Sequence, residues 1–100
     1  MEFDKPNKNN FTIYCKSGCP NCLKTKVLLK EKNLIFNVVD CDEYIIEDKK
    51  VFLLFMNQLA NKEVNTFPMI FHNGLFVGGF SETQIFVEKL LLSFEETFSF

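Results

Sequence analysis

A pair of cysteines separated by two residues stands where one local pattern of this sequence gives way to another. The preceding residues 11–15 combine β-branched and aromatic side chains, which is typical of a β-strand. From Pro20 onward the pattern is helical, and a proline suits the first helical position because no N–H is needed there. Strand composition returns at residues 35–39. The cysteine pair therefore lies at the turn of a β-α-β unit.

This unit limits how the rest of the chain can be arranged. Its crossover is expected to be right-handed, so the two strands are parallel and end at one edge of the sheet, near Cys15 and Asp40. Asn33 can end the intervening helix in the left-handed conformation. The apolar residues expected to share one face of that helix are Leu23, Val27 and Leu28.

Residues 43–62 predict a second, longer helix. They contain neither Gly nor Pro, and a break near Glu47 and Asp48 is left open. The residues at helical i, i+3, i+4 spacing are Val51, Leu54, Phe55, Gln58 and Leu59.

A hairpin and a last helix complete the pattern. Residues 69–71 and 75–77 flank Asn73-Gly74, a strong hairpin signal because both residues accept positive φ. Residues 81–84 look like a capping box, with Ser81 as N-cap and a glutamine three residues later. The side chains that this helix offers to the core are Ile85, Leu90 and Leu91.

These elements fit one domain of the α/β class. One hundred residues leave room for about one core. The order β-α-β-α-β-β-α needs helices on both faces of a four-stranded mixed sheet. We expect residues 1–10 to be a polar N-terminal tail and residues 11–100 to form the domain, with the aromatic and acidic residues 94–100 unassigned.

Charge and hydropathy exclude several classes of function. Eleven Lys, no Arg and thirteen acidic residues give a net charge of -2, so the charge gives no electrostatic reason to bind nucleic acid or anionic lipid. The sequence starts without the apolar region of a signal peptide, and its longest apolar run is far short of the ~20 residues of a membrane span. We therefore expect a cytoplasmic protein, in which cysteines are more often catalytic or metal-bound than structural.

The spacing Cys19-Pro20-Asn21-Cys22 favours a redox dithiol. One helical turn brings the two sulfurs close enough to form a disulfide. The helix N-terminus, helped by Lys16, should lower the pKa of the Cys19 thiol from ~8.5 into a range of roughly 3.5 to 7.5. Cys19 is then the nucleophile and Cys22 the resolving thiol.

A zinc site is the alternative reading of the same spacing, because two such cysteines are half of a zinc ribbon. Four ligands are then needed, and Cys15, Cys41 and His72 are the candidates. Cys15 lies inside a strand pattern and His72 in a hairpin, which counts against zinc. Cys15 and Cys41 are more simply interpreted as small buried hydrophobes, although a second disulfide between them is also considered.

Three motifs in order resemble those of dithiol glutaredoxins. They are residues 14–22 (Tyr-Cys-Lys-Ser-Gly-Cys-Pro-Asn-Cys), Thr66-Phe67-Pro68 before a strand, and Gly78-Gly79 before a capped helix. The resemblance extends from about Phe11 to Leu92 and implies a thioredoxin-like fold with glutathione-linked thiol-disulfide exchange.

The resemblance also implies a glutathione site. It makes Pro68 a cis proline, and it lets the backbone of Phe67 pair with the cysteine of glutathione. Lys16 stands where the family has a lysine for the glycine carboxylate, and Ser81 and Glu82 stand where it receives the γ-glutamyl carboxylate. The complete set of glutathione-binding candidates is Lys16, Asn21, Thr66, Phe67, Pro68, Gly79, Ser81 and Glu82.

The sequence departs from the family pattern in three places. Asn21 replaces a tyrosine, and Phe80 stands where cysteine or serine is often found. The glutamine or arginine that helps to bind the glycine carboxylate has only Gln58 as a candidate.

Three hypotheses for the function follow. The first is a monomeric oxidoreductase that reduces protein-glutathione mixed disulfides and small disulfides, with glutathione as the reducing co-substrate. The second is an iron-sulfur or metal-binding carrier, against which Pro20 argues because cluster-holding members of the family usually lack that proline. The third is an electron donor to ribonucleotide reductase that is itself reduced by thioredoxin reductase.

Overall fold

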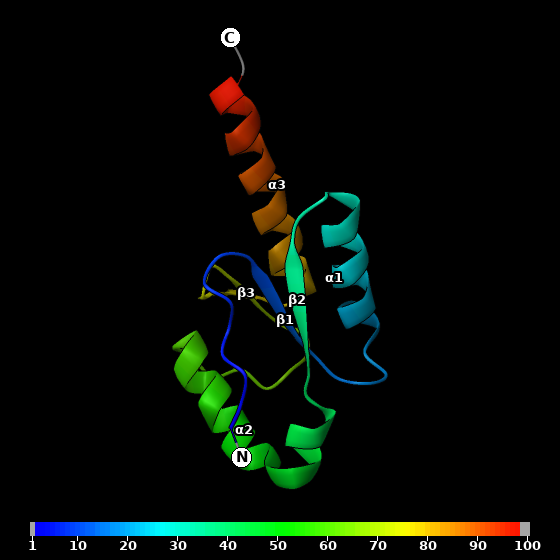
Figure 1. Cartoon of the computed structure of the whole chain (residues 1–100), viewed down its shortest axis with the longest axis vertical. Coiled ribbons are helices and arrows are strands. Elements are labelled where there is room, and N and C mark those ends of the chain that lie inside the picture. Colours follow the sequence, from blue (N-terminus) through cyan, green and yellow to red (C-terminus); the bar gives the residue numbers. More distant parts are fainter. Residues whose placement is uncertain (1, 99–100) are drawn as a thin grey trace.

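The computed structural model describes residues 2–98 of the chain and is shown in Figure 1. Within this range the elements are β1 (Phe11–Cys15), α1 (Pro20–Glu31), β2 (Phe36–Asp40), α2 (Asp42–Ala60), β3 (Met69–His72), β4 (Leu75–Gly78) and α3 (Phe80–Phe98). The strands form one sheet in the order β2-β1-β3-β4, with β1 and β2 parallel and the other neighbours antiparallel. This is the α/β, four-stranded mixed sheet of the thioredoxin-like fold, as the sequence predicts.

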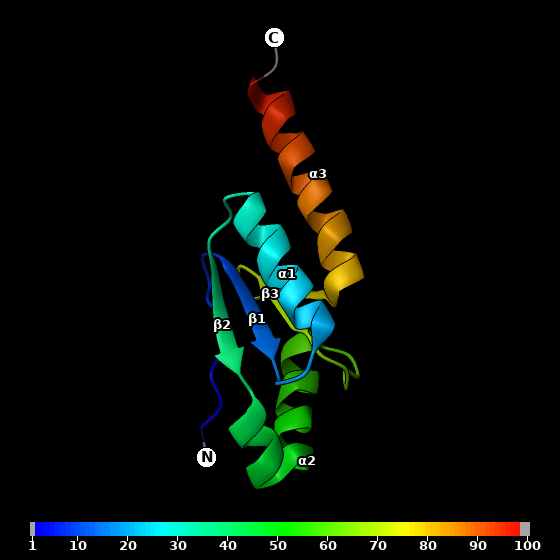
Figure 2. The same cartoon turned by 90° about the vertical axis from the view of Figure 1, so that its right-hand side faces the viewer.

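Helices cover the two faces of this sheet. Alternate residues of β1 point to opposite sides: Phe11, Ile13 and Cys15 join a core with residues of α1 and α3, whereas Tyr14 joins one with residues of α2. Figure 2 shows α1 and α3 together on one side of the sheet. The last turns of α3 extend beyond the other elements, and the longest dimension of the molecule is 53 Å.

Two local predictions about the backbone are confirmed. Asn33 has a φ of 57° just after α1, and the hairpin residues Asn73 and Gly74 have φ values of 52° and 84°. The break in the long helix that the sequence left open is present, because Asp48 has non-helical torsion angles inside α2. Of residues 94–100, those up to Phe98 continue α3, and residues 99–100 lie outside the described range.

The predicted faces of the helices are partly wrong. In α1, Leu23 and Val27 are 64% and 46% exposed. The face that is buried carries Cys22, Thr25 and Leu29 instead. A threonine can occupy the core here because its hydroxyl donates a hydrogen bond to the carbonyl oxygen of Asn21, 2.7 Å away.

The expected faces of the other two helices are also partly wrong. In α2, Val51 and Leu54 are exposed and Phe52 and Met56 are buried, whereas Phe55 and Leu59 pack against the core as expected. In α3, Ile85 is exposed, while Thr83 and Val87 are buried. Leu90 and Leu91 pack against the core as expected.

The N-terminal segment before β1 contains no helix or strand in the described residues, yet it is anchored. The ring of Phe3 lies 5.0 to 5.3 Å from the rings of Tyr44, Phe52 and Phe55. The Tyr14 hydroxyl donates a hydrogen bond of 2.6 Å to the carbonyl oxygen of Asp4. Residues 3 and 4 therefore help to cover the α2 side of the core.

None of the helices in the described part of the chain is both long and apolar enough to cross a membrane.

Candidate active site

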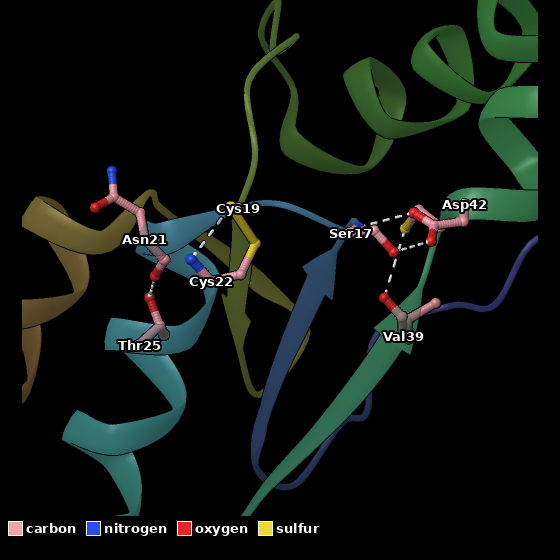
Figure 3. Close-up of a disulfide and its surroundings, with 8 residues drawn as sticks. Ser17, Cys19, Asn21, Cys22, Thr25, Val39 and Asp42 are labelled. Atoms are coloured by element: carbon pink, nitrogen blue, oxygen red, sulfur yellow. Dashed lines mark hydrogen bonds between the residues drawn. A yellow bond between two sulfur atoms is a disulfide. The ribbon is translucent and has the colours of Figure 1, made fainter.

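Cys19 and Cys22 form a disulfide at the N-terminus of α1, with their Cα atoms 5.3 Å apart (Figure 3). Cys19 is the N-cap residue, with extended torsion angles, and its Sγ accepts a hydrogen bond of 3.2 Å from the Cys22 N–H. Cys19 is half-buried and Cys22 is buried. An incoming disulfide can therefore reach Cys19, while the buried Cys22 is placed to attack only the Cys19 sulfur, once Cys19 is part of a mixed disulfide.

The charges around Cys19 favour a thiolate. The first turn of α1 carries no acidic side chain, and the free N–H groups of a helix N-terminus stabilise a negative charge. Lys16 and Lys49 both line the hollow beside Cys19. This supports the predicted order of reactivity of the two cysteines, because only Cys19 has both the helix terminus and the lysines close to it.

The hollow beside Cys19 has a volume of about 350 Å³. It is bounded by the loop before α1, by α2 and by the segment before β3. It brings together five of the residues predicted from the sequence: Lys16, Cys19, Asn21, Thr66 and Phe67. The Nζ atom of Lys16 lies 5.8 Å from the centre of the Phe67 ring, so this lysine reaches across the hollow.

A second hollow of about 480 Å³ continues from the first and shares Asn65 and Thr66 with it. Its lining includes Pro68, Gly79 and Glu82 from the predicted set. The peptide bond between Phe67 and Pro68 is cis, as the resemblance to glutaredoxins implies. Because Asn65 and Thr66 line both hollows, the two are neighbours, and we call the pair, from Cys19 to the start of α3, the groove.

The cap of α3 differs from the predicted one. The helix begins at Phe80, so Ser81 is inside the first turn and lines neither hollow. Glu82 makes the capping bond instead: its Oε1 accepts the Gly79 N–H at 2.7 Å. Glycine is required just before this cap, because a Cβ at Gly78, where φ is 138°, would lie 2.7 Å from the Cβ of Glu82.

Lys49 is the main site residue that the sequence interpretation did not find. The candidate from the long helix was Gln58, which is exposed and lines neither hollow. The carboxylate of Asp48 accepts the Val51 N–H at 3.2 Å and so caps the second segment of α2, of which Lys49 is the first residue. The sequence did contain a signal for this position: Asp48, near the possible break, is a residue type that caps helices, so Lys49 would begin a new helical segment.

Cys15 and Cys41 are buried free thiols on opposite faces of the sheet. Burial raises the pKa of Cys15 to about 11 and that of Cys41 to about 12. His72 pairs with Phe11, at the end of β1 remote from Cys15. Of the ligands proposed for zinc, His72 is thus separated from Cys15, and the described residues contain no group of three or more His, Cys, Asp or Glu that could hold a metal ion.

Comparisons with known proteins indicate the family of this chain. A family model described as Glutaredoxin matches residues 11–77. Glutaredoxin 1 of Rickettsia typhi is 36% identical over 67 residues, which are 67% of this chain and 60% of that relative. Mitochondrial glutaredoxin-2 of Rattus norvegicus is 30% identical over 78 residues, 78% of this chain and 47% of that protein. The chain thus spans less than two thirds of the length of either relative.

A solved structure shows the same fold. Glutaredoxin 1 from Francisella tularensis, crystallised in complex with cacodylate, superimposes with a TM-score of 0.71 and 31% identity. The match covers 81% of this chain and 94% of that chain. Since the family model covers more than half of the chain and includes the Cys19–Cys22 pair, the chain belongs to the glutaredoxin family.

Proposed function

We propose that this chain is a glutathione-dependent thiol-disulfide oxidoreductase that acts as a monomer on protein-glutathione mixed disulfides and small disulfides. The observation that carries the proposal is the position of Cys19. Its sulfur caps α1, is joined to Cys22, and borders a hollow lined by two lysines. Membership of the glutaredoxin family supports the same chemistry. The cytoplasmic location stays a prediction from the sequence.

Reduction of a mixed disulfide needs one cysteine. The Cys19 thiolate attacks the glutathione sulfur, the disulfide bond of the substrate breaks, and the protein thiolate leaves and takes up a proton. A second glutathione, as thiolate, then attacks the glutathione sulfur bound to Cys19. This step releases glutathione disulfide and restores the Cys19 thiolate. Each mixed disulfide that is reduced therefore consumes one molecule of glutathione.

Reduction of a disulfide between two substrate cysteines needs both Cys19 and Cys22. Cys19 first forms a mixed disulfide with one substrate sulfur and releases the other as a thiol. Cys22 then attacks the Cys19 sulfur, which frees the second substrate thiol and forms the Cys19–Cys22 disulfide. Two molecules of glutathione reduce this disulfide again and leave as glutathione disulfide.

The groove offers suitable partners to both ends of glutathione. Near Cys19, Lys16 and Lys49 suit a carboxylate, and Asn21 adds an amide. Thr66 and Phe67, just before Pro68, line the hollow, and their backbone can pair with the central cysteine of the tripeptide.

The far end of the groove lies at the start of α3. The backbone N–H groups of a helix N-terminus suit the carboxylate of the γ-glutamyl residue, and Glu82, which lines the second hollow, suits the ammonium group beside that carboxylate. The Gly79 N–H is bonded to Glu82, so Glu82 must turn away before a carboxylate can take this donor. A role for Ser81 stays a prediction, since it lines neither hollow.

A coupled assay tests the proposal. The reduced protein is given a glutathionylated peptide, with either glutathione and glutathione reductase or thioredoxin reductase as the source of electrons. We expect turnover with glutathione only. Turnover with thioredoxin reductase alone would contradict the proposal and favour the electron donor to ribonucleotide reductase. A brown colour of the purified protein, with iron and sulfide in equal amounts, would favour the cluster carrier.

A further inference from the structure

The loop that leads to Cys19 is fastened to the start of α2 by one carboxylate. Asp42 accepts two hydrogen bonds from Ser17: the Ser17 N–H donates to Oδ1 at 2.9 Å, and the Ser17 hydroxyl donates to Oδ2. Figure 3 shows both bonds beside the disulfide. We call this pair of hydrogen bonds the Ser17–Asp42 clasp.

Asp42 is itself held in place. Its N–H donates to Oδ1 of Asp40 at 3.0 Å, and the neighbouring Cys41 N–H donates to the carbonyl oxygen of Cys15 at 2.8 Å. The hydrogen bonds from Ser17 lower the pKa of Asp42, and the charge of Lys16 lowers it further. The clasp therefore holds an ionised carboxylate on a fixed part of the backbone.

The clasp joins two walls of the hollow beside Cys19. One wall is the loop with Lys16, which continues through Gly18, at a φ of 71°, to the N-cap residue Cys19. The other wall is α2, which starts at Asp42 and contributes Ile45 and Lys49. Because Ser17 lies between Lys16 and Gly18, fixing Ser17 fixes the positions of the lysine and of the cysteine sulfur relative to α2.

We propose that Asp42 is a positioning residue for the thiol-disulfide exchange, which acts through Ser17 to hold Lys16 and Cys19 in the geometry that favours the Cys19 thiolate. This inference rests on the proposed function. It assigns no contact with substrate to Asp42 or Ser17, neither of which lines the hollow beside Cys19.

A purely structural role is the alternative. A carboxylate in the first turn of α2 stabilises that helix whether or not it touches the loop, and Glu43 stands in the same turn. The two roles differ in what Ser17→Ala does. This variant leaves every charge and the whole of α2 unchanged, so an effect on Cys19 reports the position of the loop.

The test uses Ser17→Ala, Asp42→Ala, the double variant, and Glu43→Gln as a control that removes one negative charge from the same turn. Three quantities are measured: kcat/KM for a glutathionylated peptide, the pH midpoint of Cys19 alkylation by iodoacetamide, and the Tm. The alkylation needs no substrate, so it reports the clasp even if the proposed function is wrong. Wild-type turnover in the coupled assay tests that function separately.

We expect kcat/KM to fall roughly threefold in Ser17→Ala and roughly tenfold in Asp42→Ala, because the first removes one and the second both of the charge-assisted hydrogen bonds. The double variant should match Asp42→Ala, since the two residues act as one unit. The alkylation midpoint should rise in Ser17→Ala, and Glu43→Gln should behave as wild type. An unchanged midpoint in Ser17→Ala, or additive losses in the double variant, would overturn the proposal.

Discussion

Two pairs of cysteines lie at the same end of the sheet, and their environments are opposite. Cys19 and Cys22 stand at the N-terminus of α1, where one sulfur borders a hollow with two lysines. Cys15 is the last residue of β1 and Cys41 directly follows β2, and their side chains are only 4% and 0% exposed. The sulfurs of the first pair are joined, whereas those of the second point into separate cores.

This contrast shows what makes a thiol reactive in this fold. Cys41 is at the N-cap position of α2, so a helix N-terminus alone does not distinguish it from Cys19. The largest difference is burial, which raises the pKa of Cys41 because the thiolate would lose its contact with water. Charge adds to it: the first turn of α2 carries Asp42 and Glu43, whereas the first turn of α1 carries no acidic side chain. A helix terminus activates a cysteine here only together with access to solvent and to cationic side chains. The predictions below test that statement.

The largest effect is expected for Cys19→Ser. We predict a loss of turnover on the order of 10³ or more, because a serine hydroxyl is not ionised near neutral pH and forms no disulfide. The measurement is the rate of deglutathionylation in the coupled assay. Cys15→Ser is the matched control, and it should retain most of the activity of the properly folded protein. Comparable losses in both variants would remove the distinction between the two pairs.

Cys22→Ser should separate the two reactions. Deglutathionylation should continue within about tenfold of the wild-type rate, because glutathione itself resolves the intermediate on Cys19. Reduction of a disulfide between two substrate cysteines should fail, and the protein should accumulate as a mixed disulfide detectable by mass spectrometry. Equal loss of both reactions would mean that the roles of nucleophile and resolving thiol are wrongly assigned.

Smaller effects are expected for the two lysines. Lys16→Ala and Lys49→Ala should each lower kcat/KM by roughly 3- to 10-fold and shift the alkylation midpoint of Cys19 upward, because each removes a positive charge near the thiolate and near a glutathione carboxylate. Lys24→Ala is the control, since this exposed lysine of α1 lines neither hollow. If Lys49→Ala behaves like Lys24→Ala, Lys49 does not belong to the site.

Much of this architecture could be predicted because its signals are local. The cysteine spacing, the positive φ at Asn73 and Gly74, and the strand and helix order depend on residues adjacent in the sequence. The faces of α1 were mispredicted because apolar periodicity does not count a threonine, whereas Thr25 is buried and bonded to the backbone of the preceding turn.

Two walls of the hollow beside Cys19, the loop before α1 and the segment before β3, were easier to predict from the sequence than the third wall, α2. The loop before α1 and the segment before β3 carry recognisable motifs, so Lys16, Thr66 and Phe67 were found. Lys49 was missed because its position depends on the break at Asp48, which sets a new direction for the rest of α2. The Ser17–Asp42 clasp joins residues 25 positions apart and leaves no pattern in a single sequence.

The buried cysteines Cys15 and Cys41 are expected to show almost no reaction with alkylating reagents at neutral pH. The pKa of Cys15 is raised to about 11 and that of Cys41 to about 12, in each case mainly by burial. In the folded, reduced protein these thiols should therefore resist iodoacetamide between about pH 6 and pH 9, where Cys19 reacts. After mild oxidation, alkylation under denaturing conditions should find two free thiols and one disulfide.

The same raised pKa values predict that the free energy of unfolding decreases at alkaline pH. Above the ordinary thiol value of 9.0 the unfolded chain releases protons that the folded protein keeps, so stability should fall as the pH rises from about 9 toward 11 and 12. Cys41→Ala should weaken this loss, measured as the change in Tm with pH, while leaving turnover at neutral pH unchanged. Rapid labelling of Cys15 or Cys41 at pH 8, or a loss of four protons on oxidation without dimerisation, would show instead that these thiols are a second redox pair.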